Sequence, residues 1–389
     1  MVSIEYVGPF GDNSGLAYAA NQNLIALRMI KGIQVSSVAH NYSLNENKDA
    51  LALSDSDKET IVEILSTISP ERRTSRPPAI RIFHGIPRDL PLYNSTKDGV
   101  YKICYAVWET ETWPEEYVRL MNTHCHEAWV PSGFCANGLR KSGFRGHIEE
   151  IPHPIKNIDS QTIEKINIRI HGISDNSFVF YNIMGAWQQR KGIDSLFTAY
   201  FSEFSKKEDV FLFVKSSPSS DGKIQSYIES LRRAANCGEA DYLISSDDMS
   251  DEQVALIHAR GNCYVSPHAA EGFGIPLFDA TSWQNPLIFT DFSAPADFFN
   301  LDNSFPVDYF KVPVMQEYKY FDARQSWAKI DTFSLRQAMR YVYENRADAK
   351  QKAINAKEKV ISELEHEKIS EKMLERIKKI TQNKERNSQ

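Results

Sequence analysis

The stretch SPHAAEGFGIPLFDA, residues 266–280, places one acid, Glu271, before a glycine-rich turn and a second acid, Asp279, after it. The two glycines of Gly-Phe-Gly carry no Cβ, so the backbone can approach a ligand closely there. Pro276 suits the first turn of a helix, whose start would direct free N–H groups and a positive dipole end toward the turn. We therefore expect the turn to bind an anion such as a diphosphate, and the two acids to accept hydrogen bonds from hydroxyl groups.

A second group of charged residues lies in MGAWQQRKG, residues 184–192. Arg190 and Lys191 precede a segment predicted to be helical, and cations are electrostatically unfavourable at a helix start. They could be solvated surface residues, but a bound anion explains their position better. A nucleotide sugar, with its diphosphate centre and hydroxylated ends, would use both stretches.

The bulk composition describes an ordinary soluble globular chain. Its 389 residues are 42% hydrophobic and 25% charged, and the net charge of −6 argues against a general nucleic-acid binder. Five scattered cysteines suit a reducing cytosol better than a disulfide framework. The first residues show neither a cationic start nor an apolar h-region, and no apolar run reaches a membrane span, so we expect a cytoplasmic protein without a signal peptide.

Strands and helices are predicted to alternate along the chain, which is typical of parallel sheets covered by helices. The strands expected in the first half are 3–8, 33–40, 79–85, 101–109 and 127–132, and the helices are 16–32, 58–68, 114–124 and 133–143. After a polar stretch the strands are 178–185, 210–217, 241–246 and 263–268, and the helices are 191–204, 223–235 and 250–261. Ser250 and Gln253 form a predicted capping box for the last of these helices.

The restart near residue 158 predicts an α/β chain with two Rossmann-like domains facing across a cleft. The expected divisions are an acceptor-binding domain over 1–157, a nucleotide-sugar-binding domain over 158–365, and a helix with a frayed tail over 366–389. A charged helical segment is expected from Ser334 to Lys384. Glu271 follows the strand 263–268, and ligands of open parallel sheets bind at the carboxyl ends of their strands.

With these segments in place, the sequence resembles the family 4 glycosyltransferases, which are retaining enzymes of the GT-B fold. SPHAAEGFGIPLFDA is similar to the family's Glu-x7-Glu signature, and NIMGAWQQRKGIDSLFTAY to its Gly-Arg-Leu…Lys-Gly-x-Asp segment. AWVPSGFCANGLRKSGF and IEEIPHPI resemble the segment that closes the family's first domain, and YAVWETETWPEEY resembles a subgroup motif. The resemblance covers most of residues 1–345, and its Glu-Gly-Phe-Gly-x-Pro core is the most specific part.

The resemblance implies roles for several charged residues. Glu271 matches the acid that faces the transferred sugar, and Asp279 matches the acid that holds the ribose hydroxyls, although it is one methylene shorter than the family's Glu. Lys191 matches the lysine that meets the diphosphate. The family's arginine falls on Ala186, and Arg190 is the candidate replacement for its charge.

The remaining candidates follow from the same resemblance. Gly15 matches a backbone position near the phosphates, and Glu109 falls near the acceptor-side His-Asp position of the family. For Glu109 an acid at a strand end is an equally good interpretation, and His268 either lines the donor site or only packs. The donor-binding turn itself is expected to comprise Gly272, Phe273, Gly274, Ile275 and Pro276.

The implied reaction moves a hexose from a UDP- or GDP-sugar to a glycan, lipid-linked or other acceptor, with retention, as in polysaccharide biosynthesis. No metal or other cofactor is expected, because cations and a helix terminus would stabilise the leaving diphosphate. Asp55-Ser56-Asp57 matches a metal-binding string of another fold but is better interpreted as a helix cap. His124, Cys125, His126 and Glu127 have no second ligand cluster after them, which disfavours a metal site.

Other functions remain open at this stage. A nucleotide-sugar epimerase would turn over without an acceptor, and a non-catalytic partner subunit could keep the fold without the chemistry. A phosphorylase is disfavoured because no cofactor-lysine motif is present. A basic run is a solvated face or a contact with a membrane or a polyanionic acceptor; it comprises Arg72, Arg73, Arg76, Arg81 and Arg88.

Overall fold

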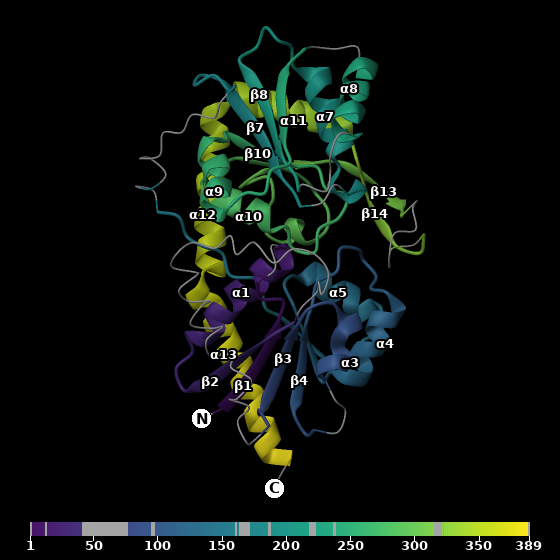
Figure 1. Cartoon of the computed structure of the whole chain (residues 1–389), viewed down its shortest axis with the longest axis vertical. Coiled ribbons are helices and arrows are strands. Elements are labelled where there is room, and N and C mark those ends of the chain that lie inside the picture. The colour runs from purple at the N-terminus through teal and green to yellow at the C-terminus, as the bar shows by residue number, and fades with distance from the viewer. Residues whose placement is uncertain are drawn as a thin grey trace. The chain divides into compact units, whose positions relative to one another are not determined.

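The computed structural model divides the chain into two compact units, one formed by Met1–Ile155 with Ser362–Gln389 and the other by Lys156–Ile361 (Figure 1). The residues that it describes are 2–11, 14–40, 77–94, 98–159, 162, 172–185, 188–217, 223–235, 239–314, 321 and 323–387. The predicted helix 58–68, the Asp55-Ser56-Asp57 string and Ala186 lie outside these residues.

The first unit is built on a six-stranded parallel sheet with the order β2-β1-β3-β4-β5-β6. Its strands are β1 Val2–Gly8, β2 Ile33–Ala39, β3 Ile80–His84, β4 Tyr101–Tyr105, β5 Glu127–Val130 and β6 His147–Glu150. Its helices are α1 Gly15–Arg28, α3 Leu90–Tyr93, α4 Glu115–His124 and α5 Gly133–Lys141, with a 3-10 turn at Pro87–Asp89. Buried aromatic and aliphatic side chains fill β1, β3, β4 and β5, as expected where both faces of a parallel sheet are covered.

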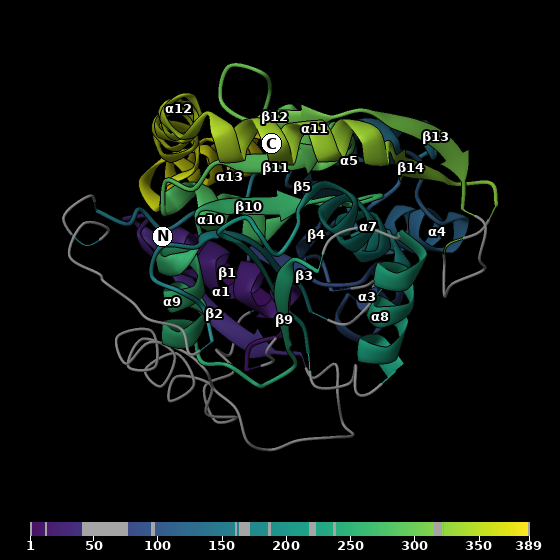
Figure 2. The same cartoon turned by 90° about the horizontal axis from the view of Figure 1, so that it is seen from above.

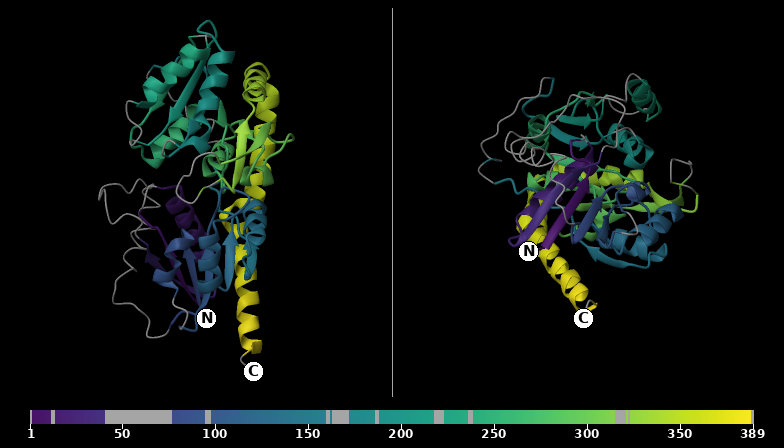
Figure 3. Two further views of the ribbon diagram at one scale, coloured as in Figure 1. Left: turned by 90° about the vertical axis from the view of Figure 1, so that its right-hand side faces the viewer. Right: turned by 60° about the horizontal axis from the view of Figure 1, so that its bottom comes forward.

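The C-terminal helix α13, His366–Asn387, also belongs to the first unit and runs beside its elements (Figure 3). His366 shares a 2.8 Å hydrogen bond with Gln22 of α1, and Arg376 forms two hydrogen bonds with the buried Glu127 of β5. A segment far away in the sequence thus completes the packing of this sheet.

The second unit contains another six-stranded parallel sheet, with the order β12-β11-β10-β7-β8-β9. The strands are β7 Phe178–Ile183, β8 Val210–Lys215, β9 Asp241–Ser245, β10 Cys263–Ser266, β11 Leu287–Thr290 and β12 Phe305–Val307. An antiparallel pair, β13 Tyr309–Pro313 and β14 Ser326–Ile330, lies outside that sheet. The helices are α7 Ile193–Glu203, α8 Lys223–Ala235, α9 Asp251–Arg260, α10 Ile275–Ser282, α11 Thr332–Glu344 and α12 Arg346–Leu364.

Helix α11 lies across the β11–β12 side of this sheet and packs beside α7 (Figure 2). The core between these helices and the strands is rich in aromatic rings, including Phe180, Phe197, Tyr200 and Phe204, all at most 1% exposed. Arg340 of α11 closes the edge of this core, because its guanidinium lies over the Phe204 ring and pairs with Glu203 and Glu208. The sheet therefore rests on a firmly packed layer, which suits it to hold loops in fixed positions.

The alternation expected from the sequence is confirmed throughout the described residues, and so is the Ser250–Gln253 capping box. The boundaries differ in places. The strand expected over 101–109 ends at Tyr105, and the helix expected over 191–204 begins only at Ile193. Arg190 and Lys191 form a separate 3-10 turn, because Gly192 adopts φ +65° and interrupts the helical path. No helix among the described residues combines the length and apolar character needed to cross a membrane.

Candidate functional site

The glycine-rich turn follows β10 directly and leads into α10, as its sequence predicts. Gly274 has φ +91°, a left-handed conformation that favours glycine, and the first turn of α10 has no side-chain cap. Pro276 stands in that first turn, where its missing N–H removes no helical hydrogen bond. The start of α10 thus presents uncapped backbone groups at the carboxyl edge of the second sheet.

Glu271 is the charged centre of this turn, and two cations converge on it. It is only 8% exposed, Lys191 Nζ lies 2.5 Å from its Oε1, and Arg190 lies 3.3 Å from its Oε2. Burial alone would raise the pKa of Glu271, but the charges of Lys191 and Arg190 hold that pKa at about 2. The carboxylate is therefore ionised at neutral pH, and two cations surround one anion.

The turn that carries the cations is tied to the loop after β10. The Ala269 N–H donates to the Arg190 carbonyl at 2.7 Å, and the Arg190 guanidinium donates to the Ala270 carbonyl at 3.1 Å. At Gly192 a Cβ would lie 1.7 Å from the Pro267 carbonyl oxygen, so only glycine fits. Residues separated by about eighty positions are thus fixed against one another by backbone contacts.

Asp279 lies on α10, one turn into the helix, and is half-buried. Burial raises its pKa to about 7, and the charge of Lys156 opposes that rise only in part. Within the described part of the chain, Asp279 makes no ion pair or side-chain hydrogen bond. The two acids of the opening motif therefore sit in opposite electrostatic environments.

Two other predicted donor-site residues are packed into the protein. Phe273 is 4% exposed and stacks on Phe278 of α10 with 4.2 Å between ring centroids, which anchors the turn to its helix. His268 is fully buried, and its Nε2 donates to the Phe292 carbonyl at 3.0 Å. Burial lowers the pKa of His268. His268 accordingly links the loops after β10 and β11.

Gly15 and Glu109 belong to the first unit. Gly15 opens α1, which Ser14 caps by accepting a hydrogen bond from Ala17 N–H at 3.2 Å. Glu109 lies in the loop that follows β4 and is half-buried. Both residues lie beyond carboxyl ends of strands in the first sheet, whereas all the other candidates lie in the second unit.

Sequence reasoning missed Ser293, which lies in the loop after β11. Its hydroxyl accepts a 2.9 Å hydrogen bond from the Glu271 N–H, and it has φ +65°. The strand β11 was not predicted, and TDFSAP shows no pattern that marks Ser293. The contact arises only because β10 and β11 are neighbours in the sheet.

The side chains of the His124–Glu127 segment meet different partners. The His124 ring contacts the Asn94 carbonyl, the Lys102 N–H donates to the His126 ring, and Glu127 pairs with Arg376. Among the described residues, Glu127, His147 and Glu149 are spaced closely enough to share an ion, but Arg376 lies between the two acids and contacts both. The Arg376 guanidinium therefore pairs with both carboxylates.

Two members of the predicted basic run lie in described residues. Arg81 is half-buried and pairs with Glu5 and Asp98, so it does not contribute to an exposed basic face. Arg88 is exposed and contacts Asp89. Arg72, Arg73 and Arg76 lie outside the described residues.

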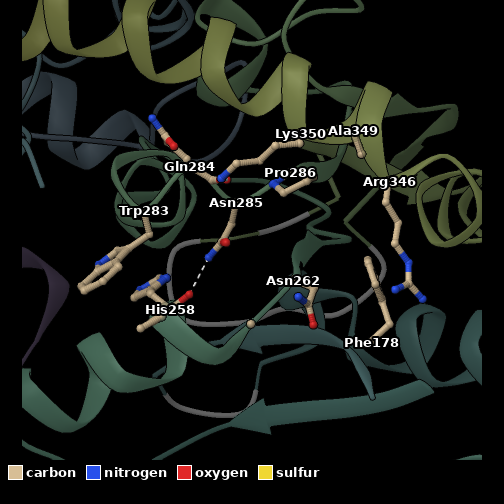
Figure 4. A pocket seen from close by; sticks show the side chains of 12 residues that line it. Phe178, His258, Asn262, Trp283, Gln284, Asn285, Pro286, Arg346, Ala349 and Lys350 are labelled. Atoms are coloured by element: carbon tan, nitrogen blue, oxygen red, sulfur yellow. Dashed lines mark hydrogen bonds between the residues drawn. The ribbon is translucent and has the colours of Figure 1, made fainter. Parts of the chain in front are cut away.

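A separate cavity of about 280 Å³ lies at the opposite edge of the second sheet (Figure 4). Its walls include Phe178, Asn262 and Pro286, which stand at the amino ends of β7, β10 and β11, and Arg346 and Lys350 reach it from α12. Glu271 follows the carboxyl end of β10. The strands are parallel, so this cavity is not part of the candidate site.

Comparisons in sequence find no relatives: no protein-family model matches the chain, and no curated protein matches it. Comparisons of structure do find matches. HepE from Anabaena, in complex with UDP-glucose, has a TM-score of 0.66 and 11% identity over 97% of this chain and 100% of that one. Sucrose-phosphate synthase from Thermosynechococcus elongatus has a TM-score of 0.68 and 15% identity over 98% of this chain and 100% of that one.

A glycosyltransferase from Rickettsia africae matches at a TM-score of 0.62 and 14% identity, over 98% of this chain and 99% of that one. These structural similarities establish the shared fold, and at identities this low they establish nothing finer. Together with the two parallel sheets, they confirm the predicted α/β architecture of two Rossmann-like units. The chain has the GT-B fold.

Proposed function

We propose that this chain is a glycosyltransferase that moves a hexose from a nucleotide sugar to a glycan or lipid-linked acceptor. The observation that carries the proposal is the convergence of Lys191 and Arg190 on Glu271 beside the uncapped start of α10. The site lies where ligands of parallel α/β sheets bind, at the carboxyl ends of β7 and β10. The UDP-glucose bound by Anabaena HepE, which shares the fold, supports a UDP-sugar as the first donor to test.

The charges of the site suit a leaving diphosphate. Among the described residues, two cations meet one carboxylate, and the N-terminus of α10 adds a partial positive charge. Negative charge on the diphosphate grows as the glycosidic bond breaks, so this environment stabilises the transition state more than the ground state. Lys191 and Arg190 would then be shared between Glu271 and the diphosphate, while Glu271 faces the sugar.

The reaction proposed is retaining and does not depend on a metal ion. The motif resemblance supports retention by front-face attack, with the leaving phosphate helping to deprotonate the acceptor. Protein cations replace the divalent ion that other folds use to neutralise the diphosphate. The loop after β4, which holds Glu109, is the proposed location of acceptor contacts.

The test is a screen of the purified full chain with UDP-glucose, UDP-galactose, UDP-N-acetylglucosamine and GDP-mannose. We expect one donor to be hydrolysed slowly without an acceptor, and Lys191→Ala to remove that activity. Products are identified by chromatography, and the anomeric configuration by NMR. Formation of an epimerised nucleotide sugar would identify an epimerase, and complete inactivity with every donor would favour a non-catalytic subunit.

A further inference from the structure

Ser293 has a backbone conformation that side-chain-bearing residues rarely adopt. Its φ of +65° and ψ of −160° fall in a region occupied almost only by glycine. Among the described residues, Gln284 is the one other non-glycine residue with positive φ. Ser293 is also 4% exposed, so the surrounding structure holds it in this unfavourable conformation.

Ser293 is hydrogen-bonded to the backbone of Glu271. The Ser293 hydroxyl accepts a hydrogen bond from the Glu271 N–H at 2.9 Å and donates one to the Phe292 carbonyl at 2.6 Å. The next residue, Ala294, donates its N–H to the Glu271 carbonyl at 3.3 Å. Both backbone polar groups of Glu271 are therefore held by two consecutive residues of the loop after β11.

The same loop also supports the glycine turn. The Phe292 carbonyl accepts from His268 Nε2, and a Cβ placed on Gly274 would lie 3.3 Å from Pro295 Cγ. Residues 292–295 thus contact the 268–274 segment at both ends. Relaxing the conformation at Ser293 would change the position of the hydroxyl that holds the Glu271 amide.

Gln284 provides the contrast. It has φ +55° directly after the α10 C-cap residue Trp283, a position where helices commonly end in a left-handed residue. Its side chain lies beside the cavity at the opposite sheet edge (Figure 4). Helix termination accounts for the conformation of Gln284, whereas no helix ends at Ser293.

We propose that Ser293 is a positioning residue whose strained conformation and hydroxyl fix the backbone of Glu271 for sugar transfer. Strained residues persist where the surrounding structure over-determines them, and they gather at active sites. The inference rests on the proposed glycosyltransferase function. It assigns Ser293 an effect on transfer that is separate from binding of the diphosphate by Lys191 and Arg190.

Two substitutions separate strain from hydrogen bonding. Ser293→Ala keeps the Cβ and its strain but removes the hydroxyl, whereas Ser293→Gly removes both. We expect the glycine variant to be more stable than the alanine variant, yet both should lose about 10²-fold in kcat, because a small misplacement of a reacting group costs that much. Binding of nucleoside diphosphate, measured by calorimetry, should stay near the wild-type value in both.

Gln284→Gly is the matched control, because it relieves a positive φ away from the site and should keep wild-type kcat. A Ser293→Gly variant with wild-type kcat would overturn the inference, and so would a loss of diphosphate affinity as large as the loss of kcat. Wild-type protein that is inactive with every donor would instead overturn the proposed function, and this inference with it. An active wild type with an active Ser293→Gly variant overturns the inference alone.

Discussion

The two units each contain a buried glutamate paired with cations, Glu127 in the first and Glu271 in the second, and the ratio of acids to cations differs between them. Glu127 is fully buried, and its oxygens accept hydrogen bonds from Tyr101, Trp129 and Arg376. Arg376 also contacts Glu149, so this cluster has two acids for one cation. Glu271 meets two cations and no neutral side-chain donor to its carboxylate among the described residues. Among the described residues, the first arrangement thus has two acids for one cation, whereas the second has two cations for one acid.

The difference shows that a buried ion pair by itself does not identify a functional site. At Glu127 the partners come from the same strand, its neighbour and a helix, and they satisfy the carboxylate on all sides. At Glu271 the partners lie in turns next to a left-handed glycine, a strained serine and an uncapped helix start. Excess charge and backbone irregularity together distinguish the second site.

The largest expected effect is a loss of stability on removing Arg376, the cation that pairs with the buried Glu127. Arg376→Ala should lower the free energy of unfolding by about 3–5 kcal/mol, because it leaves the Glu127 carboxylate buried without a cation. Urea denaturation measures the change, with Lys372→Ala, on the exposed face of the same helix, as the control. A change below about 1 kcal/mol would show that Tyr101 and Trp129 alone satisfy the carboxylate.

Removing one of the two cations that contact Glu271 should lower activity. Lys191→Ala should lower kcat/KM by about 10²–10³, mostly through kcat, because charge on the leaving group peaks in the transition state. Stability should change little, since Arg190 still neutralises Glu271. Kinetics and calorimetry with nucleoside diphosphate measure both effects, and the exposed Lys206→Ala is the control.

Glu271→Gln sharpens the same test, because it keeps the side-chain shape and removes the charge facing the sugar. Diphosphate should still bind, since Lys191 and Arg190 are released from the carboxylate, while transfer falls. If Lys191→Ala bound diphosphate and transferred sugar at wild-type levels, the phosphate site would have to lie elsewhere.

A smaller effect is expected in the pH dependence of stability, which should have opposite signs for Asp279 and Glu271. The pKa of Asp279 is raised to about 7, so its ionisation disfavours the folded state as pH rises from about 4 to 7. Asp279→Asn should therefore stabilise the protein on the order of 1 kcal/mol above pH 7, and the gain should vanish near pH 4.

Glu271 should show the opposite dependence. Its pKa is lowered to about 2, so the wild type should be more stable than Glu271→Gln above about pH 4.5. That advantage should disappear as the pH falls toward 2. Urea denaturation over pH 4–8 tests Asp279, and the range is extended downward for Glu271. Equal pH profiles for the two variants would contradict the assigned environments.

The smallest expected effect is that of a chelator. Transfer should keep its wild-type rate in EDTA, because Lys191, Arg190 and the start of α10 supply the positive charge. Rates are compared before and after dialysis against EDTA, then with added Mg²⁺ or Mn²⁺. Lost activity restored by either ion would assign the neutralising role to a metal.

Local pattern was enough to predict most of the fold. Hydrophobic runs, glycines and caps specify strands and helices through near neighbours, so the alternation, the start of α10 and the Ser250 capping box could be read directly. The boundary at Ile193 could not, because Gly192 adopts a left-handed conformation, at a point where a side chain would collide with the Pro267 carbonyl seventy-five residues away.

The sequence by itself determined which residue types are present: two cations beside a glycine, and an acid before Gly-Phe-Gly-x-Pro. Only the tertiary structure decided that Lys191 and Arg190 close on Glu271, that Asp279 makes no ion pair among the described residues, and that Ser293 holds the Glu271 amide. The order of strands in the sheet brings the Glu271 loop next to the loops that carry Lys191 and Ser293, since β7, β10 and β11 are adjacent in space but separated in the chain. Burial then raised the pKa of Asp279, whereas the charges of Lys191 and Arg190 outweighed burial and lowered the pKa of Glu271. Charge and desolvation depend on neighbours in space rather than in sequence.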